Sequence, residues 1–162
     1  MIATKSGAKE YLKAEPINTA GAVLAFDFGE KRIGVAVGES RLALAHPLTT
    51  LQVESNVDRM AAVEMLIKEW QPIRLVIGQP QHADGSEHPV AHLAKKFGNR
   101  LKERFGIAVE YIDESLSSDE AARRLREQGM SGLEGKAHID QLAAQVILQA
   151  YFDERTKHAA SS

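Results

Sequence analysis

The sequence contains no cysteine among its 162 residues, which excludes disulfide bonds and metal sites built on thiolates. It also lacks an apolar stretch as long as a membrane-spanning helix requires, and its N-terminus shows no hydrophobic segment typical of a signal peptide. These absences favour a cytoplasmic protein with no membrane partner.

No charge of one sign dominates the chain. Twenty Lys and Arg residues face 22 Asp and Glu residues, giving a formal net charge of −2. A general electrostatic attraction to nucleic acid is therefore not expected, and any basic contact surface must be local. The length fits one domain, which we predict over 21–154, between a loosely ordered extension at 1–20 and a polar tail at 155–162.

Apolar patterning predicts the order of the secondary structure. Two short apolar runs flank a polar turn that contains Gly29, which is the pattern of a β-hairpin. Later strands alternate with helices, so they should add to the sheet in parallel. The expected strands are 23–28, 33–37, 42–48, 74–78 and 107–112, and the expected helices are 55–70, 89–105, 117–128 and 139–152, with a Gly-rich loop at 130–138.

This order predicts an α/β fold with a mixed five-stranded sheet. The first three strands should form an antiparallel meander, followed by two parallel strands, with helices on both faces. In the second strand, Gly34, Ala36 and Gly38 share one face, so another element or a ligand can approach the sheet closely there. The last helix is apolar nearly all round and is expected to be buried.

Carboxylates stand at the ends of three of these elements. Asp27 lies near the end of the first strand, Asp113 and Glu114 follow the last strand, and Asp140 opens the buried helix. Each has an ordinary alternative use, such as a turn for Asp27 or a helix N-terminus for Asp140. If they converge, they form the oxygen-ligand set that Mg²⁺ or Mn²⁺ prefers, suited to phosphodiester cleavage. Because adjacent strand residues point to opposite faces, only one of Asp113 and Glu114 should join Asp27, and we favour Glu114.

Five sequence blocks occur in the order seen in one bacterial family. They are AFDFG at 25–29, RIGVAVG at 32–38, IGQP at 77–80 with DGSE at 84–87, DESLSS at 113–118, and IDQLAAQVILQ at 139–149. Through these blocks the chain resembles the Holliday-junction resolvase family, whose members are also described as nucleases that mature the 5′ end of pre-16S ribosomal RNA.

The resemblance implies an RNase H-like fold and a hydrolase that cleaves phosphodiester bonds with Mg²⁺ or Mn²⁺. It assigns catalysis and metal binding to Asp27, Glu114 and Asp140, with Asp113 as a further metal ligand. Two positions depart from the family pattern: Ser115 stands where Arg is usual, and Gln79 stands where an apolar residue is common. The missing Arg removes a phosphate or structural contact without touching the proposed metal ligands.

Several readings remain open at the level of sequence. The substrate is structured RNA in rRNA processing and ribosome biogenesis, or branched DNA in recombination, and the protein is a monomer or a homodimer. An RNA-binding assembly factor without catalysis and an actin-like ATPase are the alternatives.

Lys31 and Arg32 are the favoured nucleic-acid contacts, whereas the charged face of the helix at 89–105 is interpreted as a solvated surface. His88 and His92 have metal-pair spacing but no third soft ligand, so a polar loop and helix start explain them better.

Overall fold

The computed structural model describes residues 20–79, 89–113 and 132–161, and within the last segment the side chains of 139–156. The strands are β1 (Ala22–Phe28), β2 (Arg32–Glu39), β3 (Leu44–Gln52), β4 (Arg74–Gln79) and β5 (Ala108–Asp113), and the helices are α2 (Asn56–Trp70), α3 (Pro89–Phe105) and α5 (Gly132–Ser161). The predicted helix at 117–128 lies outside the described residues.

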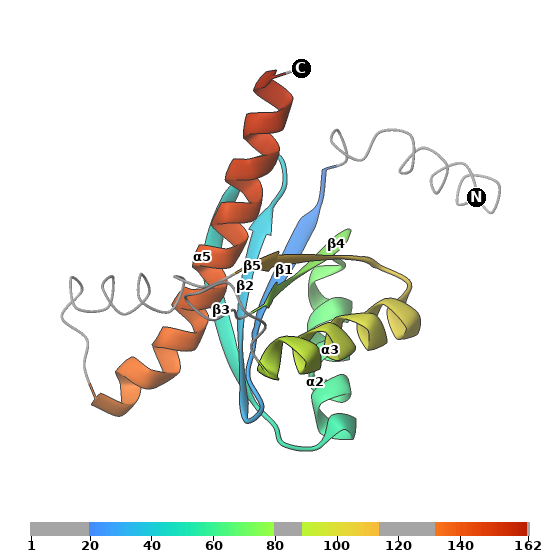
Figure 1. The fold of residues 1–162 in the computed structure, drawn as a ribbon, viewed down its shortest axis with the longest axis vertical. Coiled ribbons are helices and arrows are strands. Elements are labelled where there is room, and N and C mark those ends of the chain that lie inside the picture. The colour runs from blue at the N-terminus through green and yellow to red at the C-terminus, as the bar shows by residue number, and fades with distance from the viewer. Residues whose placement is uncertain (1–19, 80–88, 114–131, 162) are drawn as a thin grey trace.

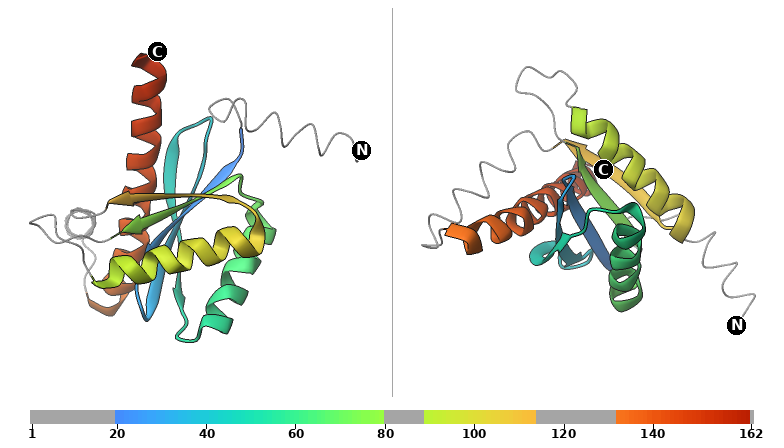
Figure 2. Two further views of the ribbon diagram at one scale, coloured as in Figure 1. Left: turned by 45° about the vertical axis from the view of Figure 1, so that its right-hand side comes forward. Right: turned by 90° about the horizontal axis from the view of Figure 1, so that it is seen from below.

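The five strands form one mixed sheet in the order β3-β2-β1-β4-β5. β1, β2 and β3 pair antiparallel, and β4 and β5 join β1 in parallel. Helix α5 crosses one face of this sheet, while α2 and α3 cover the other (Figures 1 and 2). The predicted sheet, with its antiparallel meander and parallel pair, is confirmed.

Two apolar layers follow from the alternation of side chains along the strands. Leu24, Phe26 and Phe28 of β1 are buried toward α2 and α3, and Val23 and Ala25 are buried toward α5. The α5 layer consists of small sheet residues opposed by a largely apolar helix, with Ala144, Ile147, Leu148, Tyr151 and Phe152 buried. The prediction that this helix is buried is confirmed.

Helix α2 begins and ends where its local sequence directs it. The Ser55 hydroxyl accepts a hydrogen bond from the Asp58 amide at 3.1 Å, the usual N-cap contact. Gln71 closes the helix in a left-handed conformation with its amide bonded to the Ile67 carbonyl. Helix α3 likewise ends at Gly106, whose φ is 66°. The predicted start of α2 near 55 and the predicted ends of α2 at 70 and of α3 at 105 are confirmed.

Helix α5 is longer than its apolar core suggested. It runs from Gly132 to Ser161, so the Gly-rich loop predicted at 130–138 is wrong for 132–138, and the end predicted near 152 is also wrong. No proline interrupts this stretch, and outside the packed part the good helix formers Ala, Glu, Lys and Arg outnumber its two glycines, Gly132 and Gly135. Helical propensity thus extends the helix beyond the part that packs on the sheet. No helix in the described residues has the length and apolarity to cross a bilayer.

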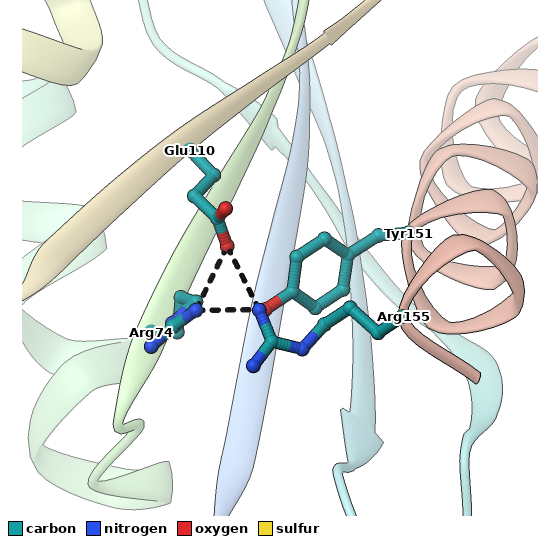
Figure 3. Close-up of polar contacts among 4 residues, drawn as sticks. All are labelled: Arg74, Glu110, Tyr151 and Arg155. Carbon is teal, nitrogen blue, oxygen red and sulfur yellow. Dashed lines mark hydrogen bonds and ion pairs between the residues drawn. The ribbon is translucent and has the colours of Figure 1, made fainter. Parts of the chain in front are cut away.

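Two sets of polar contacts hold α5 against the sheet. Gln149 accepts a hydrogen bond from the Ala45 amide and donates one to the Ala43 carbonyl, both at 3.0 Å, so it occupies backbone groups near the start of β3. At the end of the sheet where β4 begins, Arg74 donates to Glu110 at 3.0 Å and to the Tyr151 hydroxyl at 3.2 Å (Figure 3). These contacts fix the position of α5 along the sheet.

Candidate active site

Asp27 is the only acidic residue of β1, and it belongs to the face of the sheet that α5 covers. Its neighbours Phe26 and Phe28 are buried toward α2 and α3, so alternation turns the Asp27 side chain to the opposite face. In the sheet, Asp27 stands between Gly34 of β2 and Gly78 of β4. A partly buried carboxylate is therefore flanked on both sides by residues that have no side chain.

Gly34 explains how Asp140 comes close to Asp27. A Cβ atom at Gly34 would collide with the backbone of Asp140, so α5 lies directly on the sheet at this point. Gly34 is also the antiparallel partner of Asp27. Residues 27 and 140, separated by more than a hundred positions in sequence, therefore meet at one place on one face. The close approach predicted from the small-residue face of β2 is confirmed, with α5 as the approaching element.

The carboxyl group of Asp140 has a specific electrostatic environment. Its Oδ2 lies 3.0 Å from Arg32 Nε, and the Asp140 side chain is only 19% exposed. Burial raises the pKa of Asp140 above its ordinary value, and the positive charge of Arg32 opposes that rise. Oδ2 is buried, and within the described part of the chain its polar contact is this ion pair with Arg32.

A cavity of about 710 Å³ opens beside this carboxyl group. Its walls come from the β1–β2 turn, the end of β3 and the first part of α5. The lining residues are Gly29, Glu30, Lys31, Arg32, Gln52, Glu54 and Asp140. The two cations favoured as nucleic-acid contacts, Lys31 and Arg32, thus share one cavity with Asp140. The ion pair between Arg32 and Asp140 was not anticipated from sequence, since over a hundred residues separate them.

The other predicted acidic ligands come from the end of β5. Asp113 is exposed and pairs with Gln79 in the parallel ladder. Alternation assigns Asp113 to the face of Val109 and Tyr111, which pack toward α2 and α3, and hence to the face opposite Asp27. Glu114 and Ser115 lie outside the described residues.

The donor chemistry of the described pocket suits a hard cation. Asp140 lines the cavity with a carboxylate, and Asp27 lies on the same face of the sheet without lining the cavity. Arg32 already lies 3.0 Å from Oδ2 of Asp140. Within 20–79, 89–113 and 139–156, no three His, Asp or Glu side chains are grouped closely enough to hold a metal ion. A complete ligand set would therefore need a group from outside these ranges. His92, which was not expected to bind a metal, is exposed, and His88 lies outside the described residues.

Arg59 is a structurally important residue that sequence reasoning missed. It is 8% exposed, and one of its terminal nitrogens donates to the Glu30 carbonyl at 2.6 Å. Another donates to the Asn56 side chain at 3.2 Å, and the guanidinium lies over the Phe28 ring at 5.3 Å. Arg59 thereby holds the β1–β2 turn, which forms one wall of the cavity, against α2. In the sequence, the only indication of its burial was its position on the face of the helix that packs into the core.

The chain matches known proteins over nearly all of the described fold. The sequence profile of the family described as "RuvX: Holliday junction resolvase" matches residues 21–154. A protein of Dechloromonas aromatica named "Putative pre-16S rRNA nuclease" is 56% identical over 133 residues, 82% of this chain and 91% of that protein. A protein of the same name from Methylobacillus flagellatus is 53% identical, with the same coverage of both chains.

Solved structures agree with the architecture. RuvC of Thermus thermophilus has a TM-score of 0.50 at 16% identity, covering 84% of this chain and 96% of RuvC. RuvC of the same organism in complex with a Holliday junction has a TM-score of 0.51 at 19% identity, with the same coverage. This likeness confirms the predicted RNase H-like fold.

The family profile and the named relatives also bear on the enzyme class. Both denote nucleases, which confirms the prediction of a hydrolase that acts on nucleic acid. The match of the profile to residues 21–154 and the identities above 50% both exceed what a shared fold alone produces. The chain belongs to the RuvX family of Holliday junction resolvases.

Proposed function

We propose that this protein is a divalent-metal-dependent nuclease that cleaves phosphodiester bonds of structured RNA at the 5′ end of pre-16S rRNA. The observation that carries the proposal is the meeting of Asp27 and Asp140 on one face, enforced by the contact of the Asp140 backbone with Gly34. The names of the relatives supply the substrate. The proposed site of action is the cytoplasm, in ribosome biogenesis.

In this proposal Asp27, Asp140 and Glu114 hold Mg²⁺ or Mn²⁺, and Asp113 is a further candidate ligand. The position of Asp113 on the opposite face of the sheet supports Glu114 as the ligand from this segment. The bound metal supplies charge stabilisation at the scissile phosphate and an activated water. Hard carboxylate oxygens are the ligands such ions prefer.

The remaining residues of the pocket orient the substrate. Lys31 and Arg32 are exposed at the mouth of the cavity, where they contact phosphate oxygens of the incoming strand. Arg32 also lies 3.0 Å from Asp140 and neutralises its charge before the metal and substrate arrive. Recognition through backbone and shape fits this arrangement better than base-specific readout.

The test is a cleavage assay on a precursor rRNA end with Mg²⁺, with Mn²⁺ and with EDTA. Wild-type protein should cut only with metal, and Asp27→Asn and Asp140→Asn should remain folded without cutting. Asp153→Asn is the matched control, because Asp153 is an exposed carboxylate on the same helix as Asp140. Full activity of Asp27→Asn would refute the assignment.

Holliday-junction cleavage is the second candidate, favoured by the description of the family. A four-way DNA junction tested beside the RNA decides between the two substrates. Preferential metal-dependent cutting of the junction would replace rRNA processing by resolution and would favour a twofold dimer.

A further inference from the structure

A second cavity lies on the other face of the sheet, between α2 and α3. Its volume is about 320 Å³, within the range of small-ligand sites, which is roughly 300–1,000 Å³. Phe28 of β1 and Phe97 of α3 lie beneath it, with ring centroids 5.2 Å apart. None of the residues assigned above to metal binding or to phosphate contact is among those that line this cavity in the described part of the chain.

The second cavity adjoins the candidate active site. Glu30 of the β1–β2 turn and Glu54 of the β3–α2 connection line both cavities. A strand bound beside Asp140 therefore needs only to pass these two residues to enter the space between α2 and α3. Because the two cavities share this wall, they adjoin each other at the protein surface.

The mouth of this cavity combines an apolar contact with exposed cations. Leu93 is 38% exposed although it belongs to a helix with a well-buried face. Lys96 and Arg100, one turn apart on α3, are exposed and line the cavity. Within the described residues neither forms an ion pair, whereas Arg104, one turn further along, pairs with Glu64 at 3.3 Å.

The floor of the cavity holds an arginine without a carboxylate partner. Arg59 is more than nine-tenths buried, and its hydrogen bonds are with the Glu30 and Val53 carbonyls and the Asn56 amide oxygen. Its Nε has no hydrogen-bond partner in the described part of the chain. With Lys96 and Arg100, the cavity carries three cations against the two carboxylates of Glu30 and Glu54. An anionic ligand with an apolar part fits this balance.

We propose that the α2–α3 cavity binds one unpaired nucleotide of the nucleic-acid strand that continues from the cleaved bond. Its base lies against the exposed Leu93, and its phosphate is contacted by Lys96 and Arg100. Phe28 and Phe97 are nearly buried and support the apolar wall of the cavity. Contact of the base with a side chain, together with cations along the backbone, is the general mode of single-strand binding. This inference rests on the proposed function only in that the substrate is a nucleic acid.

The first test measures binding without cleavage. A fluorescently labelled single-stranded RNA is titrated in EDTA with wild-type protein, with Lys96→Gln/Arg100→Gln, and with Lys95→Gln/Lys102→Gln. The control pair removes the same charge from exposed positions of the same helix that do not line the cavity. The cavity pair should raise Kd on the order of tenfold and reduce the salt dependence by about 1.4, two contacts at roughly 0.7 each. Equal weakening by both pairs would overturn the proposal.

The second test isolates the base. Leu93→Ala should raise Kd severalfold for the RNA, and this difference should vanish for an oligomer of base-free sugar-phosphate units. An Leu93→Ala variant that binds RNA like the wild type would overturn the proposal. Failure of the wild type to cleave, with the cavity effects intact, would remove the proposed nuclease activity and leave this binding site supported.

Discussion

Replacing Gly34 by Ala tests whether the meeting of α5 with the sheet creates the active site. The added Cβ would collide with the backbone of Asp140, which cannot rotate away as a side chain could. The helix must therefore lift or slide at the residue that supplies a candidate ligand. Asp27, the partner of Gly34 across the hairpin, keeps its place in β1, so the two carboxylates should separate.

The magnitude follows from overpacking a close-packed contact. Such substitutions cost about 1–3 kcal/mol of unfolding free energy. For a domain of this size, each kcal/mol corresponds to about 2–4 °C in Tm, so Gly34→Ala should lower Tm by roughly 2–12 °C. Misplacing a catalytic group by about 1 Å costs on the order of a hundredfold in rate, so metal-dependent cleavage should fall far more than stability.

Gly38→Ala is the matched control. It lies on the same face of β2 beneath α5, and its Cβ would stand 2.7 Å from the Phe152 ring and 2.5 Å from the Leu44 carbonyl oxygen. Gly38→Ala should lower Tm by a similar amount. Because Gly38 pairs with Val23 at the opposite end of β1, this variant should leave Asp140 in place. Both variants are assayed for cleavage well below their Tm, per folded molecule. If folded Gly34→Ala cleaves at the wild-type rate, the contact of α5 with Gly34 does not create the active site.

Three further predictions follow from the charged contacts. Because burial raises the pKa of Asp140, its ionised form destabilises the fold above that pKa, so Asp140→Asn should increase the free energy of unfolding at neutral pH. In urea titrations this gain in unfolding free energy should disappear as the pH falls below the ordinary pKa of a carboxyl group. A gain that is independent of pH would contradict the prediction. Arg32→Gln removes the cation that opposes the rise in the pKa of Asp140, so the acidic limb of the pH–rate profile should move to higher pH. An unmoved limb would show that Arg32 does not influence the titration of Asp140. Tyr151→Phe removes the hydroxyl that Arg74 contacts, which should cost about 1 kcal/mol in chemical denaturation and leave cleavage unchanged. Loss of cleavage there would show that the far end of the sheet is coupled to the site.

Local sequence determined most of the secondary structure. Ser55 and Gly106 mark helix ends by backbone chemistry that depends only on neighbouring residues, and the structure places both ends as expected. The alternation of Gly34, Ala36 and Gly38 with larger residues indicated that one face of β2 allows another element to approach closely. The ends of α5 were harder to predict, because apolar periodicity marks only the part of a helix that packs.

The candidate site depended on contacts between distant segments. The acidic residues were visible in the sequence, but their convergence needed the register of β1 with β2 and the seating of α5 on Gly34. The ion pair of Arg32 with Asp140 and the buried position of Arg59 were invisible for the same reason. The sequence by itself determined the elements and the chemical groups at their ends, because hydrogen bonding and side-chain alternation act over a few residues. Only the tertiary structure decided which groups meet, because that depends on how the packed layers fit together.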